Sequence, residues 1–494
     1  MEKTVISSLL LFTIFSVWCS QAQPSTTQEL IKGFKATPNE NEPFFHSLLT
    51  DSYGNYSFGF LRINKNQLTL GVIHVKSAET IWTTNLGRLA KWAGSTDLFF
   101  NGSLVLLDNN GGGVLWSTHT DGGRVWLSNN SNLQVQKLDD VSRVYSTLWQ
   151  SFNFPSDTLV ENQNFTSDML LYSSNGVYSM RLGSNFFGLY ANFNLGSNRT
   201  RMYFKHKALE AKASVVEGKG PIYAVLSSDG YLGMYQNGSS VPIDVESFIS
   251  YQEPGVGVRR LKLESDGNLK GYYWTGSNWI EDYKGIHDPC QLPSGCGSYG
   301  LCRSGKGCSC LDNGTDYSKS NGQCVSNDNK QGDFCSTYSH RGKFKVLRIV
   351  GVELPNKELV ESHKMESLKD CENACQVNCT CWGAVYSNSS GFCYILDYPI
   401  QTLVSVGDDT KVGYFKERVN NGTSKIRVGL GIALAILFGL ILLISGIIIG
   451  WRCYRTREGK RGVKMFEEED AVVGVGPYKG LRDESFRSIE LSER

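Results

Sequence analysis

The sequence predicts a mostly β protein with two small disulfide-rich modules and one transmembrane helix. Short segments rich in Tyr, Phe and Trp alternate with Gly and Asn turns, a pattern typical of β proteins. Twelve of the 14 cysteines fall between Cys290 and Cys393, a density typical of disulfide frameworks. Two apolar stretches, 5–18 and 428–451, have the lengths of a signal peptide and of a membrane span.

The two apolar stretches predict a type I membrane protein. Lys3 precedes the first, and Ser20-Gln21-Ala22 supplies the small residues of a cleavage site, so 1–22 is expected to be a signal peptide. The second has 24 residues without a charge, enough to cross ~30 Å of hydrocarbon at ~1.5 Å per residue. More basic residues follow it than precede it, which predicts a cytoplasmic tail at 452–494. The expected location is the plasma membrane, with the N-terminal ectodomain extracellular.

Glycosylation sequons agree with this topology. All ten precede 428–451, and none follows it. Their one-sided distribution is expected if 23–427 is exposed to the secretory lumen. The candidate sites are Asn55, Asn101, Asn129, Asn164, Asn198, Asn237, Asn313, Asn378, Asn388 and Asn421.

Composition excludes two classes of protein. A chain of 494 residues that is 40% hydrophobic is not expected to be disordered, and its length suggests two to four domains. A formal net charge of +1 gives no electrostatic reason to expect a nucleic-acid partner.

The N-terminal region, 30–150, shows a weak tryptophan repeat. Trp82, Trp116 and Trp126 occupy similar places in successive short strands. We therefore expect a symmetric all-β core in which these three rings stack.

Four segments of this region match a known family. They are Phe58-Gly59-Phe60, Ile81-Trp82-Thr83-Thr84-Asn85, NGSLVL at 101–106 and LWQSFNFPSDTL at 148–159. With the first three, the region resembles the bulb-type (mannose-binding) lectin domain, and the fourth resembles the end of this domain in plant S-locus glycoproteins and S-domain receptor-like kinases. The resemblance implies a β-prism of three four-stranded sheets.

The next region, 151–286, repeats the strand-and-turn texture, with an Asp-Gly turn inside 261–272. It resembles the S-locus glycoprotein segment, which implies a second lectin-like domain.

The first cysteine block lies within 287–325, where six cysteines permit fifteen pairings that spacing alone does not distinguish. Asp288-Pro289-Cys290 with CGSYGLC at 296–302 resembles the EGF-like module of the same family. The resemblance implies Cys290–Cys302, Cys296–Cys308 and Cys310–Cys324. The acidic ligands that precede a calcium-binding EGF module are missing around His287 and Asp288, so no calcium is expected.

The second cysteine block lies within 335–418. Ser367 is expected to cap a helix that places Cys371 and Cys375 on one face. An oxidising compartment favours disulfides over a zinc cluster here. SLKDCENAC at 367–375 with NCTC at 378–381 resembles a PAN/apple domain, an α+β fold. The resemblance implies Cys371–Cys393 and Cys375–Cys381, with Cys335 left for Cys379.

Bulb-type lectins bind mannose through a Gln-x-Asp-x-Asn-x-Val-x-Tyr strand. The best-placed strand offers Phe99, Asn101, Ser103, Val105 and Leu107, and a second offers Ser128, Asn130, Asn132, Gln134 and Gln136. Sites that bind hydroxyl groups lose affinity when donors become apolar. We therefore expect a lectin fold whose first sugar site is lost.

Neither a catalytic constellation nor a cofactor motif is found, so the expected protein is not an enzyme and has no metal. A tail of 43 residues is not expected to fold into the kinase that follows the span in S-domain receptor kinases. We expect a cell-surface receptor-like protein that binds an extracellular protein, peptide or glycan ligand and associates with receptor kinases as co-receptor or decoy. The alternative is a lectin for mannose-type or cell-wall carbohydrate.

The span suggests further contacts. Small residues recur at Gly431, Ala435, Gly439, Gly446 and Gly450, which favours lateral pairing as a homodimer or with a receptor, although lipid-facing glycine explains them equally well. Cys453, beside the cytosolic boundary, is a candidate for lipidation.

Overall fold

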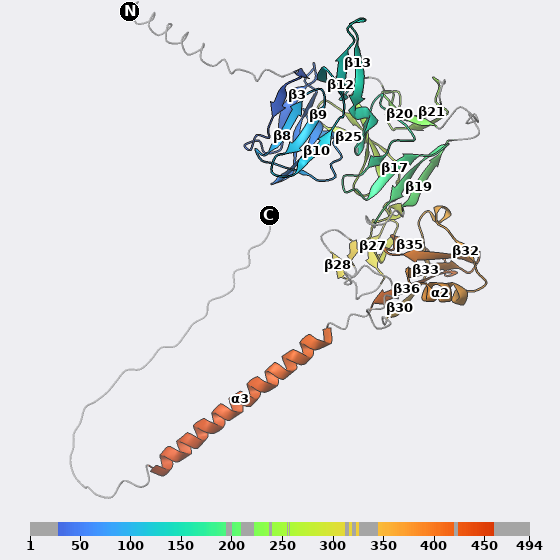
Figure 1. Cartoon of the computed structure of the whole chain (residues 1–494). Helices are drawn as coiled ribbons and strands as arrows, with labels where there is room; N and C mark the ends of the chain where they lie inside the picture. The colour runs from blue at the N-terminus through green and yellow to red at the C-terminus, as the bar shows by residue number, and fades with distance from the viewer. Residues whose placement is uncertain are drawn as a thin grey trace, which may run out of the picture. The chain divides into compact units, whose positions relative to one another are not determined.

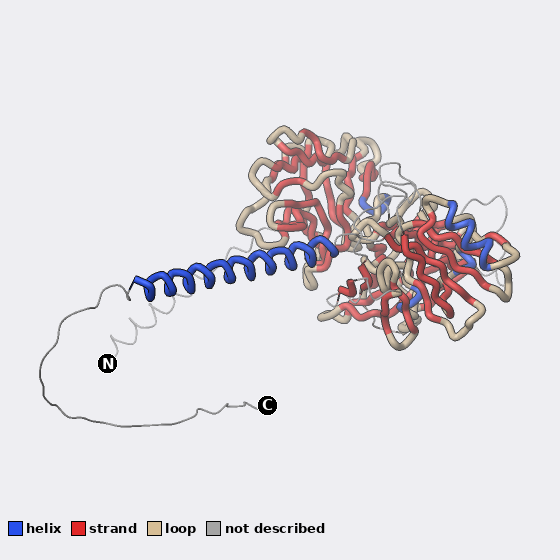
Figure 2. The backbone as a smooth tube through the Cα atoms, turned by 90° about the horizontal axis from the view of Figure 1, so that it is seen from below, coloured by secondary structure: helices blue, strands red, loops and turns tan. Residues whose placement is uncertain are grey.

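The computed structural model describes residues 28–193, 200–208, 222–236, 240–253, 255, 257–311, 316–318, 323–325, 344–418 and 423–458. The chain divides into two compact units, Met1–Val419 and Asn420–Arg494. The expected signal peptide, 1–22, and the tail beyond 458 lie outside the described residues. Figures 1 and 2 show that the first unit consists almost entirely of strands and loops, as the mostly β prediction requires.

The first domain contains three antiparallel sheets, here sheets A, B and C. Sheet A has the order β1 (Glu29–Ile31), β11 (Arg124–Leu127), β12 (Leu133–Leu138), β13 (Tyr145–Gln150). Sheet B has the order β10 (Gly113–Ser117), β9 (Leu104–Asp108), β8 (Thr96–Phe100), β2 (Phe34–Ala36). Sheet C has the order β3 (Phe45–Thr50), β4 (Tyr56–Asn64), β5 (Gln67–His74), β6 (Glu79–Thr83), and β7 (Ala90–Lys91) pairs with β5.

One core holds these sheets together, because alternate side chains of every sheet point into it. It includes Phe58 and Leu70 of sheet C, Leu106 of sheet B and Val135 of sheet A, all fully buried. The contacts between the tryptophan rings beside this core differ from the prediction. Trp82 and Trp116 both meet Trp149 edge to face, at 6.0 and 5.6 Å between centroids.

The prediction that Trp126 stacks with Trp82 and Trp116 was wrong. Its neighbours Val125 and Leu127 are fully buried, so strand alternation turns Trp126 to the outer face, where Arg124 lies 5.9 Å from its ring. Trp149 takes the third place instead.

The second domain also contains three four-stranded antiparallel sheets, here sheets D, E and F. Sheet D has the order β14 (Thr158–Val160), β23 (Arg259–Leu263), β24 (Leu269–Trp274), β25 (Trp279–Lys284). Sheet E has the order β15 (Asn164–Phe165), β20 (Tyr223–Ser227), β21 (Tyr231–Tyr235), β22 (Asp244–Ser247). Sheet F has the order β16 (Leu171–Tyr172), β17 (Tyr178–Leu182), β18 (Phe186–Ala191), β19 (Arg201–Lys207). A short 3₁₀ helix, η1 (Ser151–Asn153), precedes β14.

A buried ion pair lies within the second domain. The Arg259 guanidinium is 2.5 Å from Asp282 Oδ2 and also donates to Ser250 Oγ at 2.6 Å and to the Ser228 carbonyl at 3.0 Å. The two charged side chains are 1% and 2% exposed. Arg259 therefore ties β23 to β25 and to two turns of sheet E.

The first cysteine block forms two hairpins. Its elements are η2 (Pro289–Gln291), β26 (Gly300–Arg303), β27 (Gly307–Cys310), β28 (Asp316–Ser318) and β29 (Gln323–Val325). Its disulfides join Cys290 to Cys302, Cys296 to Cys308 and Cys310 to Cys324, the pairs that the EGF-like resemblance implies.

The second cysteine block forms a five-stranded sheet with one helix. The sheet order is β30 (Phe344–Val350), β36 (Lys411–Arg418), β33 (Cys381–Ser387), β34 (Phe392–Asp397), β32 (His363–Lys364). The helix, α2 (Leu368–Val377), begins after Ser367, whose Oγ accepts from the Asp370 amide as predicted. Disulfides join Cys371 to Cys393 and Cys375 to Cys381. Cys379 is also disulfide-bonded, and Cys335 lies outside the described residues.

The two cysteine blocks share a sheet. Strands β31 (Val352–Glu353) and β35 (Leu403–Ser405) of the second block extend the β26–β27 hairpin of the first, and β26 runs parallel to β35. Another 3₁₀ helix, η3 (Lys357–Leu359), follows β31. The expected boundary between an EGF-like and a PAN-like module therefore crosses one continuous sheet.

In the second unit, the described residues form the helix α3 (Thr423–Glu458), which includes the expected span 428–451. The side chains of 423–435, 453–454 and 456–458 lie outside the described set. Among the helices that the structure describes, none contains a described segment long and apolar enough to cross a bilayer.

Candidate ligand-binding site

The first expected sugar strand is a hairpin. Strand β8 ends at Phe100 and β9 begins at Leu104, so the prediction of one strand carrying five site residues was wrong. Gly102 adopts φ +115°, a conformation that favours glycine, and the Asn101 side chain accepts from the Ser103 amide at 3.1 Å. These local preferences end the strand.

The hairpin nevertheless brings three of the five residues onto one face. Phe99 pairs with Val105, and Leu107 lies two residues further along β9. Asn101 and Ser103 lie in the turn, where Ser103 Oγ donates to the Thr120 carbonyl at 3.0 Å. The face thus offers apolar groups where a mannose site needs donors and acceptors.

The second expected sugar strand is also broken. Ser128, Asn130 and Asn132 lie in the turn before β12, while Gln134 and Gln136 lie on β12. Asn132 is 5% exposed, and its amide nitrogen donates to Gln150 Oε1 at 2.9 Å. On the strand, Gln136 Nε2 donates to Gln134 Oε1 at 2.6 Å. These amides bind one another and are not arranged around an open pocket.

A third copy of the lectin spacing was missed from sequence. Glu264, Asp266, Asn268, Lys270 and Tyr272 keep its Asp, Asn and Tyr. Asn268 is fully buried, with its amide donating to the Ile286 carbonyl at 2.8 Å and accepting from the Ile286 amide at 3.0 Å. The Tyr272 hydroxyl donates to Glu264 at 2.7 Å. The retained Asn268 and Tyr272 therefore bind other parts of the second domain and are not free to bind a sugar.

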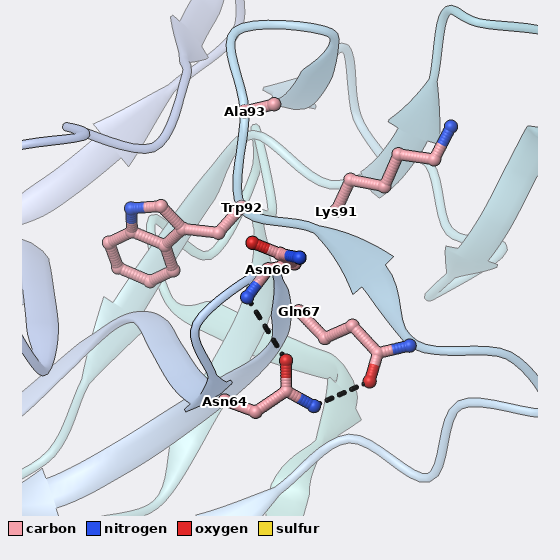
Figure 3. A pocket seen from close by; sticks show the side chains of 6 residues that line it. All are labelled: Asn64, Asn66, Gln67, Lys91, Trp92 and Ala93. Atoms are coloured by element: carbon pink, nitrogen blue, oxygen red, sulfur yellow. Dashed lines mark hydrogen bonds between the residues drawn. The ribbon is translucent and has the colours of Figure 1, made fainter. Parts of the chain in front are cut away.

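An open cavity of about 610 Å³ lies at the β4–β5 hairpin, outside the expected strands. Figure 3 shows its lining residues, which are Asn64, Asn66, Gln67, Lys91, Trp92 and Ala93. The Asn64 amide donates to Gln67 Oε1 at 2.6 Å, and the Asn66 backbone N–H donates to Asn64 Oδ1 at 3.0 Å. Several amide groups therefore converge beside an indole ring.

The cavity is lined by one positively charged side chain, Lys91, and by the buried indole ring of Trp92. Lys91 and the amides are exposed, while Trp92 is 7% exposed and carries the Arg62 guanidinium 4.2 Å from its ring centroid. None of the six lining residues is acidic. Sequence reasoning missed this cavity because it joins a turn to a loop 24 residues further along, and neither has a motif. Its chemistry suits a neutral or anionic polar ligand.

A histidine held by two carboxylates links sheets E and F. His206 Nε2 lies 2.6 Å from Asp244 and Nδ1 lies 2.5 Å from Glu246. Burial lowers the pKa of His206, but the hydrogen bonds and charges of Glu246 and Asp244 outweigh burial and raise the pKa above 6.5.

We expect the second domain to lose stability as pH rises above about 6.5. The raised folded-state pKa of His206 gives stabilisation that is complete below the unfolded value of 6.5 and is lost as pH rises through the folded pKa. Amide hydrogen exchange of β19 and β22 between pH 5 and 9 measures this after correction for intrinsic exchange. His206→Gln should flatten the profile, whereas replacing the exposed His363 should not. An unchanged profile in His206→Gln would contradict the assignment.

Metal binding finds no support among the described residues. The one group of ligand atoms close enough to share an ion is Cys296, Cys302 and Cys308, and all three sulfurs are in disulfides.

The two three-sheet domains, followed by two blocks of disulfide-bonded cysteines, indicate a lectin-like protein of the S-domain class. The S-locus glycoprotein domain model matches residues 234–316, and the PAN domain model matches 345–419. A PAN domain-containing protein of Arabidopsis thaliana is 48% identical over 493 residues, which cover 99% of this chain and 98% of that protein. The chain belongs to this family of proteins with S-locus glycoprotein and PAN domains, so the predicted resemblance is confirmed.

More distant relatives fall into two groups. A G-type lectin S-receptor-like serine/threonine-protein kinase of A. thaliana is 26% identical, over 77% of this chain and 45% of the kinase. EP1-like glycoprotein 4 of A. thaliana is 25% identical, over 73% of this chain and 84% of that glycoprotein. The chain thus spans about half the length of this kinase and most of the glycoprotein.

Proposed function

We propose that this chain is a non-catalytic, single-pass type I plasma-membrane receptor-like protein that binds an extracellular ligand and associates with receptor kinases as co-receptor or decoy. The observation that carries the proposal is the extent of the kinase similarity. It covers 77% of this chain but 45% of the kinase. The common part consists of modules suited to binding, and association with kinases would supply the signalling chemistry.

Anchoring in the membrane is part of this proposal. The sequence 428–451 is free of charge and is followed by Arg452, Arg455 and Arg457, as expected at a cytosolic boundary. In α3, Gly446 and Gly450 leave open space where a Cβ would lie, with no atom within 4 Å. A Gly-x-x-x-Gly face of this kind lets a second helix approach closely. We also propose that each three-sheet domain is a β-prism of the bulb-lectin type.

Affinity purification of the intact protein under mild crosslinking tests the association. Mass spectrometry should recover receptor kinases, and the double variant Gly446→Leu/Gly450→Leu should recover severalfold less because bulky side chains separate the helices. The variant Ile447→Leu/Ile448→Leu keeps the volume and is the matched control. Recovery of no kinase with the unaltered protein would count against the co-receptor proposal.

A second candidate function is a cell-surface lectin. The cavity at Asn64, Gln67 and Lys91 favours it, because amide groups beside a tryptophan are suited to sugar hydroxyls. A role in cell-wall carbohydrate binding would use this cavity in place of the apolar hairpin at Phe99.

A glycan array probed with the full-length protein separates the two candidates. If the cavity is a sugar site, Asn64→Ala should lower the affinity for the bound glycan by about tenfold, because a good polar contact is lost. Lys65→Ala, in the same turn but not lining the cavity, is the control. Binding of mannose at micromolar strength that Asn64→Ala leaves intact would point back to another face.

A further inference from the structure

A buried histidine lies at the joint between the first and second domains. His74, the last residue of β5, is 2% exposed. Its ring meets Tyr56 of the first domain at 5.7 Å between centroids, edge to face. It meets Trp274 and Trp279 of the second domain in the same way, at 4.8 and 5.4 Å. Three aromatic rings therefore enclose the imidazole and leave it almost no contact with water.

The hydrogen bonds at this joint fix the protonation state of the histidine. Ser77 Oγ accepts from Trp279 Nε1 at 3.0 Å and from the Glu79 amide at 3.3 Å. Both lone pairs of the hydroxyl are then used, so its hydrogen is directed to His74 Nδ1, 2.9 Å away. Nδ1 is therefore an acceptor, and the imidazole is neutral. A proton on Nδ1 would break this hydrogen bond, because two donors would then face each other.

The charges around His74 also oppose its protonation. Burial lowers the pKa of His74 below 6.5, and the charges of Lys76 and Arg260 lower it further. Asp51 raises this pKa, but by less. Glu79 lies opposite His74 in the β5–β6 ladder, but its carboxylate pairs with Arg260 at 3.2 Å. No carboxylate of the described residues forms an ion pair with His74, so a proton there would be an unpaired charge.

The groups that contact His74 also join the two domains. Ser77 and Glu79 belong to the first domain, and Trp279 and Arg260 belong to the second. The Trp279–Ser77 hydrogen bond and the Arg260–Glu79 ion pair cross the joint. The Arg260 guanidinium also lies 4.2 Å from the centroid of the Trp279 ring. Because His74 contacts both partners of the hydrogen bond, a charge on its ring would act directly on the joint.

We propose that His74 is an acid-sensitive switch, and that protonation of its ring opens the joint between the first and second domains. The lowered pKa in the closed joint gives stabilisation that is complete above 6.5, the ordinary value of the histidine pKa. This stabilisation is lost as pH falls from 6.5 through the lowered pKa. The effect has the opposite sign to that of His206, so the two histidines can be distinguished. The proposal does not depend on which ligand the ectodomain binds.

Hydroxyl-radical footprinting of the full-length protein in detergent at pH 5 and pH 7.5 tests the switch. Mass spectrometry identifies the labelled side chains. Trp274, which is 8% exposed, should be labelled severalfold more at pH 5, because opening the joint uncovers it. Trp92, 7% exposed within the first domain, should be labelled equally at both pH values and serves as the internal reference.

Two variants assign the effect to the histidine. His74→Gln cannot gain a charge but can still accept from Ser77, so its Trp274 labelling should not change with pH. His363→Gln, at an exposed histidine of β32, is the matched control and should keep the full response. Equal labelling of Trp274 at both pH values in the unaltered protein would overturn the proposal, as would a full acid response in His74→Gln.

A surface variant decides the question if His74→Gln is strongly labelled at both pH values. Lys76→Glu changes an exposed side chain and places a negative charge where a positive charge opposes protonation. The protonated ring would then be tolerated in the closed joint, and Trp274 labelling at pH 5 should fall severalfold. Labelling of Lys76→Glu equal to that of the unaltered protein would, in that case, overturn the switch.

Discussion

Arg259→Met is expected to destabilise the second domain by about 3–5 kcal/mol, because it leaves the buried Asp282 carboxylate without its cation. Asp282 would keep the Ser250 backbone N–H at 2.8 Å and the Ser250 hydroxyl at 2.6 Å. Two neutral donors do not replace a guanidinium in a site that excludes water. Amide exchange of β23 and β24 in the full-length protein measures the change locally, which suits a chain of several domains.

Two further variants isolate the charge effect. Lys262→Met removes a cation from the same strand whose side chain is 23% exposed and 3.9 Å from Glu264, and it should change stability by about 1 kcal/mol or less. The double variant Arg259→Met/Asp282→Leu should recover much of the loss, since apolar pairs often replace buried ion pairs without penalty. A single variant as stable as the unaltered protein would contradict the expected role of the buried pair.

Loss of the Cys371–Cys393 disulfide is expected to have the second large effect. This bond ties α2 to β34 across a sequence separation of 22, whereas Cys375–Cys381 spans 6. Constraint of the unfolded chain grows with loop length, which predicts losses of about 3 kcal/mol for the first bond and about 2 kcal/mol for the second. Paired Cys→Ser variants, compared by hydrogen exchange of β33 and β36, measure both.

The shorter bond is the matched control, because both disulfides anchor the same helix. Peptide mapping without reduction verifies that the remaining cysteines keep their partners. If the Cys375–Cys381 variant proves the less stable of the two, the loop-length explanation fails. Local packing, for example around the buried Lys416 that donates to the Cys375 carbonyl at 2.7 Å, would then dominate.

Local patterns explain why much of the fold was predictable. Short segments rich in aromatic residues predict strands, and β4 contains one of them, Phe58-Gly59-Phe60. Ser367 followed by Asp370 predicts the start of α2, because capping depends on neighbours in sequence. Cysteine positions predict two compact blocks, and the family resemblance supplied the pairing that spacing alone left open.

What the sequence did not predict depends on distant contacts. Trp126 and Trp149 look alike as strand tryptophans, and only the register of sheet A decides that one faces outward. Arg259 and Asp282 are each unremarkable in sequence, yet burial makes them a pair. The cavity at the β4–β5 hairpin also depends on a distant contact, because Lys91 lies beside Gln67 only where β7 pairs with β5.

The pairing of β30 with β36 has a mechanical consequence. The two strands run antiparallel with Phe344 opposite Arg418 and Val350 opposite Val412. The chain therefore enters and leaves the PAN-type sheet at the same end of one ladder. Tension between these two points would load the hydrogen bonds of the ladder one after another, beginning at Phe344. It would not load them all at once, as a shearing force does. Under a pulling force applied at Phe344 and Arg418, this ladder would therefore open from one end.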